Sequence, residues 1–446
     1  MFVTYHFPPS MEMGAHTCAQ IARHLSLYGW EPVVLTVKER YAELAGDALE
    51  GEFPGRVLRT GLLPHPLTLY RLVKSKLPVE TTEGAPGNRP RDRGLFRRRL
   101  LSLLLVGESY LGWTLPATLA GLRGIRRYRV RHLLSSGPPW ACHLVGLLLS
   151  RITGLPWIAH FRDPWSQPTA GSVRGAARRI DAALERIVIN RATFVVCVTD
   201  EHTESLRHAY PGCPAGKFHT IPNGFDGKEW AGLAVDPALT DSREDTAFTI
   251  TYTGQLYEAR SPLPVFKALR TLIDSGDIDR ERVRVELIGW CDSAEGRRVA
   301  DLADDCGIGD RVAVRGPLPR REALRALTRS DLLLLLAEGW TVQIPGKTYE
   351  YLRAGRPILA LTSEGALPDL LKEMGGAAVI DPRDLAGIAS VVRQTYRGWQ
   401  EGRPLAGADQ ALVSRFDRRA LAGRFAELLT AGARAHGERD SRPPRG

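Results

Sequence analysis

Two charged side chains three residues apart, Lys347 and Glu350, could together hold a nucleotide. They follow Pro345 and Gly346, which favour a loop, and they occupy the first turn of a predicted helix that ends at Ala354. The start of a helix binds phosphate because its N–H groups are unpaired, and a lysine adds a full positive charge. A carboxylate one turn along can accept hydrogen bonds from the vicinal hydroxyls of a ribose. A solvated ion pair on a surface helix is the alternative.

Loops that follow other predicted strands of the second half add further candidates. Gly254 would let a ligand approach the backbone closely, and Leu318 could flank a flat base. Arg260 is a second cation that, together with Lys347, could neutralise a diphosphate leaving group, which is electrostatic catalysis without a metal. With one glycine of the first half, the candidate donor-binding residues are Gly14, Gly254, Arg260, Leu318, Lys347, Tyr349 and Glu350.

The first half offers candidates for the acceptor side. Gly14 lies in a loop after the first predicted strand, where a glycine lets a helix start approach a phosphate. Asp163 follows a predicted strand and could orient a sugar or acceptor hydroxyl, although an Asp before a proline is also a common turn residue. His160 lies in the same predicted strand. It could be catalytic, and a histidine packed in the core is the alternative. The acceptor-side candidates are His160, Arg162 and Asp163.

The composition restricts the class of protein. The chain has 446 residues, which favours two or three domains, and 60 basic against 50 acidic residues give a formal net charge of +10. Such a charge suits a nucleotide, an anionic membrane surface or nucleic acid, with a solvated arginine-rich face as the alternative. Six cysteines without a C-x-x-C pair indicate a reducing compartment. We find neither a signal peptide nor an apolar run of the roughly 20 residues that span a bilayer, so we expect a cytoplasmic protein.

Several kinds of site are not indicated. Asp277 and Asp279 are spaced like carboxylates that hold a metal on a sugar nucleotide, but they precede a predicted strand and so lie at its amino end. We interpret them as a solvated turn and expect no metal and no other cofactor. The sequence has no phosphate loop with Gly-Lys-Ser/Thr and no nucleophile elbow. Its arginines do not alternate with aromatic residues, so we expect no nucleic-acid partner.

The order of the predicted elements indicates how these residues come together. Short apolar strands alternate with helices in both halves, as sheets buried on both faces require. The fold class is therefore α/β, with two Rossmann-like doubly wound domains that face a cleft, and ligands of such sheets bind beyond the carboxyl ends of the strands. The predicted strands are 2–5, 32–37, 131–135, 157–161, 193–198, 219–221, 249–253, 283–288, 312–315, 332–336, 358–361 and 377–380.

The first predicted strand begins so near Met1 that the start of the sequence could truncate it. The chain divides into five predicted parts. The parts are an N-terminal domain 1–229, a linker 230–247, a C-terminal domain 248–415, a last helix 416–433 and a disordered tail 434–446. A mobile basic loop is expected at 81–99. The arginine- and leucine-rich stretch 89–106 could lie on an anionic membrane surface, giving a peripheral location at the inner face of the cell membrane; a core-packed helix is the alternative.

Together these stretches resemble a family over nearly the whole chain. They are similar to retaining glycosyltransferases of family four (glycosyl transferase group 1), in a branch of bacterial polysaccharide-type enzymes. The matching stretches are Phe7-Pro-Pro-Ser10 with Gly14, Gly29-Trp-Glu-Pro-Val-Val-Leu-Thr36, Phe161-Arg-Asp-Pro-Trp165, Ile221-Pro-Asn-Gly-Phe-Asp226, Tyr252-Thr-Gly254, and Pro345-Gly-Lys-Thr-Tyr-Glu-Tyr-Leu352 with Gly355-Arg-Pro-Ile-Leu359.

The resemblance implies the two-domain GT-B fold, with a nucleotide-sugar donor bound mainly by the second domain and a last helix that crosses back onto the first. Glu350 matches the second glutamate of the family's Glu-x7-Glu motif, which binds the ribose, and Lys347 belongs to the donor loop. Arg260 takes the place of the phosphate-binding lysine. Asp163 falls at the family's acceptor-side His-Asp position, with Arg162 where histidine is usual.

We therefore expect transfer of a sugar, with retention, from a nucleoside-diphosphate donor to a hydroxyl of a glycan, a lipid-linked or a small-molecule acceptor, in cell-surface polysaccharide or glycolipid assembly. Two positions depart from the family: Val342 stands where the first glutamate would fall, and Gln255 where many members have arginine. These departures keep an alternative open, a non-catalytic glycan- or membrane-binding module. A sugar-nucleotide epimerase or a phosphorylase is a further alternative on the same fold.

Overall fold

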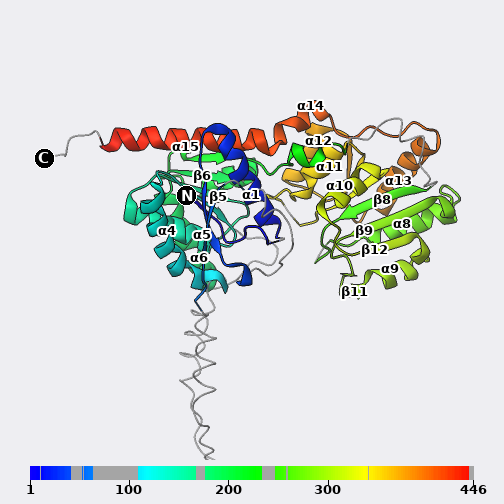
Figure 1. The fold of residues 1–446 in the computed structure, drawn as a ribbon. Coiled ribbons are helices and arrows are strands. Elements are labelled where there is room, and N and C mark those ends of the chain that lie inside the picture. Colours follow the sequence, from blue (N-terminus) through cyan, green and yellow to red (C-terminus); the bar gives the residue numbers. More distant parts are fainter. Residues whose placement is uncertain are drawn as a thin grey trace, which may run out of the picture. The chain divides into compact units, whose positions relative to one another are not determined.

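The computed structural model describes residues 1–10, 12–41, 53, 55–63, 109–166, 176–233, 247–257, 260–339 and 341–440. The chain forms two compact units: unit 1 comprises Met1–Ile221 and Ala422–Gly446, and unit 2 comprises Pro222–Leu421 (Figure 1). The predicted basic loop 81–99, the stretch 89–106 and most of the predicted linker lie outside the described residues.

Unit 1 is built on a parallel sheet of seven strands. Its strand order is β3-β2-β1-β4-β5-β6-β7, so the order reverses between β1 and β4. This is the doubly wound arrangement predicted from the sequence. The strands are β1 (Phe2–Val3), β2 (Val33–Val37), β3 (Arg56–Thr60), β4 (Leu133–Gly137), β5 (Trp157–Phe161), β6 (Phe194–Cys197) and β7 (Phe218–Thr220).

Helices cover the sheet of unit 1 and bury large aromatic side chains, among them Trp113, Trp157 and Phe161. Gly146 has the Trp157 indole where a Cβ would stand, so only a glycine lets that helix approach the strand so closely. The helices are α1 (Met13–Leu25), α4 (Thr114–Tyr128), α5 (Ala141–Thr153), α6 (Ala176–Arg191) and α7 (Asp200–Ala209), with short 3-10 turns η1 (Ser26–Tyr28), η2 (Glu39–Tyr41), η4 (Ser109–Trp113) and η5 (Ala215–Lys217).

Unit 2 is built on a parallel sheet of six strands in the order β12-β9-β8-β13-β14-β15, which reverses between β8 and β13. The central strand β13 consists of leucines that alternate between two cores, Leu334 on one face and Leu335 on the other, because helices cover both faces. The strands are β8 (Phe248–Thr253), β9 (Val283–Ile288), β12 (Val312–Arg315), β13 (Leu332–Leu336), β14 (Ile358–Leu361) and β15 (Ala377–Ile380), with a small antiparallel hairpin of β10 (Ser293–Ala294) and β11 (Arg297–Arg298).

The helix at the centre of the predicted site has the predicted bounds. It is α11 (Lys347–Ala354), and Gly355 ends it in the left-handed conformation at φ 66°, which glycine adopts without steric cost. The other helices of unit 2 are α8 (Leu263–Asp274), α9 (Val299–Asp305), α10 (Arg320–Arg329), α12 (Ala366–Met374), α13 (Leu385–Gln400) and α14 (Gln410–Val413), with 3-10 turns η6 (Gly227–Trp230), η8 (Arg280–Arg282), η9 (Gly309–Arg311) and η10 (Ser414–Phe416).

The unit boundaries differ from the predicted ones. Unit 2 already begins at Pro222, and Trp230, which was predicted to start the linker, is 5% exposed and packs in the core of unit 2. The last helix, α15 (Arg418–Asp440), begins in unit 2 and belongs to unit 1 from Ala422 onward. It also extends past the predicted end at residue 433, because the prolines that cannot continue a helix come only at 443 and 444. Among the described residues, no helix is both long and apolar enough to span a bilayer.

Candidate functional site

The carboxyl ends of β8 and β13 are neighbours at the point where the strand order of unit 2 reverses. Gly254 follows β8 directly, and Arg260 lies in the same loop before α8. The loop after β13 leads to Lys347, the first residue of α11. The topology therefore collects these three predicted residues at the edge of the sheet where ligands bind in doubly wound folds.

Lys347 is a buried cation. The residue is only 9% exposed, and its Nζ lies 4.0 Å from the centroid of the Tyr252 ring. The ammonium has no hydrogen-bond partner among the residues that the structure describes. Burial, and then the nearby charge of Arg260, lower its pKa from 10.5 to about 7. Burial disfavours the ammonium because its hydrating water is lost, and Arg260 disfavours it by repulsion, so a bound anion would favour the charged form.

Gly254 makes room for that lysine. A Cβ at this position would overlap Nζ of Lys347, and the backbone has φ 124°, which side chains rarely adopt. Gly289, after β9, has its own Cβ position filled by the Gly254 carbonyl, and the Cys291 thiol donates to the same carbonyl at 3.3 Å. Burial raises the pKa of Cys291 to about 12, so the thiol stays neutral. Glycine at both positions thus lets two loops and a lysine meet at one point.

Arg260 provides a second buried cation and is 6% exposed. Its guanidinium stacks over the Tyr257 ring at 4.4 Å from the centroid. Its charge lowers the pKa of Lys347, so the two cations act on each other. Two like charges at the carboxyl edge of a sheet, beside a helix start, create a strong positive potential. This arrangement can bind a compact polyanion such as a diphosphate.

Glu350 has a partner that the sequence did not reveal. Its Oε1 accepts from Nη2 of Arg320 at 2.6 Å, and the same nitrogen binds Oε2 of Glu229 at 2.9 Å. Burial opposes the charge of Arg320, but the two carboxylates outweigh it and raise the pKa of the guanidinium. Glu350 is therefore paired with Arg320 rather than with Lys347, and the suggested surface ion pair between positions 347 and 350 is not formed.

The two tyrosines that flank Glu350 have different environments. Tyr349 packs in the core against the Phe416 ring, with centroids 4.9 Å apart. Tyr351, which sequence analysis missed, accepts a hydrogen bond from the Thr253 N–H at 2.8 Å and so ties α11 to the end of β8. Leu318 is half-buried in the loop after β12. The structure thus gathers Gly254, Arg260 and Lys347, keeps Glu350 one turn along the same helix, and places Tyr349 in the core.

The candidates of unit 1 lie near the carboxyl ends of its strands. Gly14 comes after β1, one of the two strands at the point of reversal, and the other candidates lie at or directly after the end of β5. The Arg162 guanidinium lies against Gly14, where a Cβ would overlap it, and it donates to the carbonyl of Pro138. His160 is 2% exposed; its Nδ1 is 3.1 Å from Oγ of Ser136, and its ring contacts Phe425 edge-on. Asp163 is half-buried after β5. Gly14 and Arg162 are thus in contact, whereas His160 occupies a packed position beneath α15.

Asp277 and Asp279 both have partners in the protein. Asp277 accepts from Nε of Arg393 and from Nη2 of Arg397, both at 2.9 Å, and Asp279 caps the short turn η8. A hydrogen bond from Ser275 and these arginines hold the pKa of Asp277 below its usual value. These contacts are structural, as expected for a turn at the amino end of β9.

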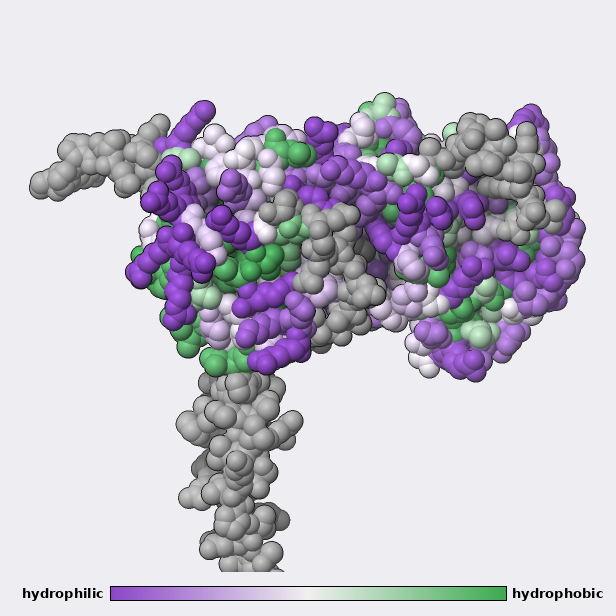
Figure 2. All heavy atoms as spheres, viewed as in Figure 1, coloured by the Kyte–Doolittle hydropathy of each residue, from purple (hydrophilic) through white to green (hydrophobic). Residues whose placement is uncertain are grey.

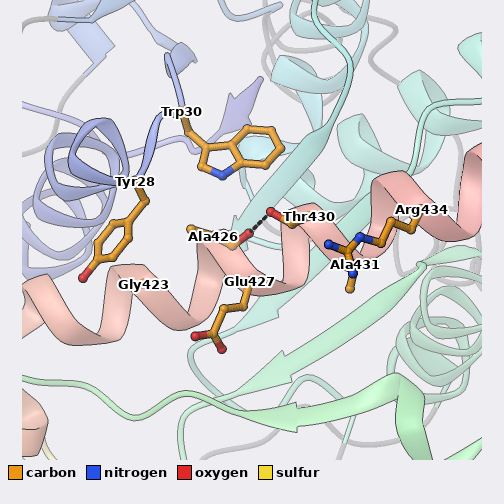
Figure 3. Close-up of a pocket in the computed structure, with 8 residues that line it drawn as sticks. All are labelled: Tyr28, Trp30, Gly423, Ala426, Glu427, Thr430, Ala431 and Arg434. Carbon is orange, nitrogen blue, oxygen red and sulfur yellow. Dashed lines mark hydrogen bonds between the residues drawn. The ribbon is translucent and has the colours of Figure 1, made fainter.

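A separate cavity of about 450 Å³ lies in unit 1 and holds none of the predicted site residues. Figure 3 shows Trp30 and Tyr28 on one side and α15 on the other, with the Thr430 hydroxyl donating to the carbonyl of Ala426. Gly423 makes room for the Tyr28 ring, which would contact a Cβ there at 2.9 Å. This cavity marks where α15 packs on unit 1.

Comparison with known families gives two matches along the chain. Residues 14–224 match the model of the glycosyl transferase 4-like domain, and residues 247–397 match that of the glycosyl transferases group 1. Two curated relatives are similar in sequence. One, from Catenulispora acidiphila, is named D-inositol 3-phosphate glycosyltransferase 1 and is 24% identical over 57% of this chain. Another, a D-inositol 3-phosphate glycosyltransferase from Thermobifida fusca, is 22% identical over 51%. The matched regions span 61% and 53% of these relatives' own lengths.

Solved structures share the fold. The sucrose-phosphate synthase of Thermosynechococcus elongatus superposes with a TM-score of 0.67, covering 97% of this chain and 98% of that one at 15% identity. Anabaena Alr3699/HepE, solved in complex with UDP and glucose, superposes with a TM-score of 0.63, covering 96% and 98% at 16% identity. The family models confirm the predicted glycosyltransferase family, and the solved structures confirm the predicted fold class.

Proposed function

Because this chain belongs to the family-four, group-1 glycosyltransferases of the GT-B fold, we propose that it transfers a sugar with retention from a nucleoside-diphosphate donor to an acceptor hydroxyl. The observation that carries the proposal is the pair of buried cations, Lys347 and Arg260, at the carboxyl edge of the unit 2 sheet. A diphosphate is a compact anion that such a pair can neutralise.

In this mechanism the bond between the sugar's anomeric carbon and the diphosphate oxygen breaks, a bond forms between that carbon and the acceptor oxygen, and the acceptor's proton passes to the departing phosphate oxygen. Negative charge develops on that departing oxygen as its bond to carbon breaks. Lys347 and Arg260 stabilise that charge from fixed positions, which lowers the barrier because no solvent has to reorganise. Glu350 accepts hydrogen bonds from the ribose hydroxyls, held in place by Arg320. Asp163 positions the acceptor hydroxyl in unit 1. No residue in this scheme requires a metal.

We further propose an acceptor that is a glycan, a lipid-linked or a small molecule, in cell-surface polysaccharide or glycolipid assembly in the cytoplasm. Support comes from the family, from the basic composition and from cysteines without a paired motif. Val342 is half-buried and Gln255 is exposed. Since both depart from the family's pattern, we expect the contacts to the donor sugar to differ from those of typical members.

The transfer reaction is tested by NMR of the products formed from UDP-, GDP-, ADP- and dTDP-glucose in the presence of D-inositol 3-phosphate or simple glycosides. Release of one nucleoside diphosphate that depends on the acceptor, with an unchanged anomeric configuration, supports the proposal. An inverted product would contradict retention. An isomerised donor formed without acceptor would instead indicate an epimerase.

Donor binding should take up a proton at Lys347. Its pKa is about 7 in the folded protein, lowered by burial and by Arg260. The charge of Glu350 opposes this lowering, and the Tyr252 ring lies beneath the ammonium. A bound diphosphate favours the ammonium, so affinity should fall as the pH rises from about 7 to about 9. Calorimetry at pH 8 in buffers of different ionisation enthalpy should show uptake of up to one proton. A Lys347→Met protein should show none, and proton-independent binding by the wild type would contradict the assignment.

Glu350→Gln should separate ribose binding from phosphate binding. Loss of a charge-assisted hydrogen bond to the ribose should weaken UDP or another preferred nucleotide by roughly tenfold or more. Pyrophosphate has no ribose, so its affinity should be unchanged. Calorimetric titration of both ligands into wild type and variant checks this, with Glu364→Gln, an exposed glutamate of unit 2, as the control. An equal loss of affinity for both ligands would show that Glu350 maintains the structure of the site and does not bind the ribose.

A further inference from the structure

Three helices form one layer on the sheet of unit 1, and their outer sides carry an unusual mixture of residues. α4 packs on α5 and α5 packs on α6, and Figure 1 shows the three together. Leu149 of α5 occupies the space where a Cβ of Gly121 in α4 would stand, so these two helices are in close contact. We refer to the outer side of α4, α5 and α6 as the basic helical face.

Large apolar side chains are exposed on the basic helical face. On α4, Leu115 is 56% and Leu119 47% exposed; on α5, Leu148 is 36% and Ile152 60% exposed. On α6, Ile187 is 49% exposed. Leu115 and Leu119 are one helical turn apart, as are Leu148 and Ile152, so each pair forms a stripe along its helix. Figure 2 shows apolar side chains among hydrophilic ones over this part of unit 1. A single exposed leucine is ordinary, but repeated pairs on adjacent helices indicate an interaction site.

The charges on this face have one sign. α4 and α5 contain no Asp or Glu. Both acidic side chains of α6 accept hydrogen bonds from neighbouring residues. Glu185 is 1% exposed and accepts from the Tyr210 hydroxyl at 2.7 Å, and Asp181 accepts from the indole N–H of Trp165 at 3.3 Å. Exposed arginines surround the apolar stripes, among them Arg123, Arg126, Arg127, Arg151, Arg179 and Arg186.

We propose that the basic helical face docks unit 1 on an anionic lipid surface, with the leucine and isoleucine side chains among the headgroups and the arginines on lipid phosphates. Aliphatic side chains with basic neighbours are the features of a peripheral membrane surface, which gains from apolar burial and from attraction to anionic lipids. A nucleic-acid surface would instead present aromatic rings for stacking, and the exposed apolar side chains here are aliphatic. The proposal concerns residues of unit 1, whereas Lys347 belongs to unit 2, and it does not depend on sugar transfer.

The test is co-sedimentation of the full chain with vesicles of phosphatidylcholine and phosphatidylglycerol in equal parts, and with vesicles of phosphatidylcholine alone. Binding should require the anionic lipid and weaken as salt rises. Arg123→Gln with Arg126→Gln should lower binding by roughly tenfold or more, because each basic residue near such a surface contributes appreciably. Leu119→Gln with Ile152→Gln should have a similar effect, because less apolar area is buried.

Matched controls come from unit 2. Arg321→Gln with Arg325→Gln removes the same charge from the exposed side of α10, and Leu385→Gln with Leu412→Gln removes two leucines that are 40% and 41% exposed. Neither control should change vesicle binding. Circular dichroism confirms folding, and should the Leu119 and Ile152 double variant fail to fold, Ile152→Gln alone replaces it.

Several outcomes would overturn the proposal. They are absence of vesicle binding, binding that does not require anionic lipid, and binding that both α4–α5 variants leave unchanged. A stable dimer in light scattering that the leucine variants dissociate would show that a second copy covers this face. Nucleotide titration of the same variants should match wild type, so failure of the lipid proposal and failure of the donor site are distinguishable.

Discussion

Lys347→Met should weaken nucleoside-diphosphate binding by roughly a hundredfold while leaving the unliganded protein at least as stable as wild type. The lost ammonium would otherwise make charge-assisted hydrogen bonds to the diphosphate, worth about 1.5–3 kcal/mol. In the unliganded protein the same ammonium is buried beside Arg260 and has no hydrogen-bond partner among the described residues. Methionine fills a similar volume and packs well on the Tyr252 ring. Binding and stability should therefore change in opposite directions.

Calorimetry and thermal unfolding measure the two effects, and Lys372→Met, on the exposed side of α12, is the control. The stability gain should depend on pH. Below a pH of about 7, the pKa of Lys347 in the folded protein, the ammonium is charged and its burial destabilises the folded state most. This destabilisation decreases as the pH rises toward about 10.4, where lysine loses its proton in the unfolded chain. A variant that binds nucleotide like wild type would remove Lys347 from the site. One that unfolds more readily at pH 6 would show that its charge is compensated.

Arg320→Met should be the most destabilising single change near the site. Arg320 joins Glu229 and Glu350 through one nitrogen, so its loss leaves two carboxylates close together with Glu350 only 7% exposed. Removing one partner of a fully buried ion pair costs about 3–5 kcal/mol. The Arg320 side chain is 35% exposed, so solvent screens the pair and we expect about 2 kcal/mol.

Chemical denaturation at neutral pH, followed in wild type, Arg320→Met and the exposed neighbour Arg321→Met, measures this loss. Nucleotide affinity should fall together with stability, because Glu350 loses the contact that orients it. Pyrophosphate affinity should change much less, since Lys347 and Arg260 remain. A variant as stable as Arg321→Met would contradict a stabilising role for the ion-pair network, whatever its nucleotide affinity.

Residues that act on their own backbone predicted the helix and strands around the site well. Pro345 and Gly346 before the helix and Gly355 after it gave the bounds of α11, because proline and glycine act on their own backbone and need no distant partner. The leucine run of β13 could be recognised as a strand covered on both faces from composition and length alone. The rule that ligands lie at carboxyl strand ends then selected Gly254, Arg260 and Lys347.

Contacts between distant residues could not be predicted in the same way. Nothing around Arg320 indicates that it pairs with Glu350, thirty residues along the chain. The choice between Tyr349 and Tyr351 depends on which side of α11 faces the sheet, and two residues on a helix differ by more than half a turn. The unit boundary depends on where Trp230 packs, and α15 extends further than polar composition suggested. Each of these is decided by tertiary packing.

The proposed function requires that unit 2 bind a nucleoside diphosphate at Lys347 and Arg260. The most direct measurement is calorimetric titration of UDP, GDP, ADP and dTDP into the wild-type protein and into Lys347→Met, with unfolding scans to show that both are folded. We expect one of the four to bind clearly more tightly than the others, and the variant to lose this binding. If no diphosphate binds to the folded wild-type protein, or if the variant binds as well as wild type, the cation pair is not a donor site.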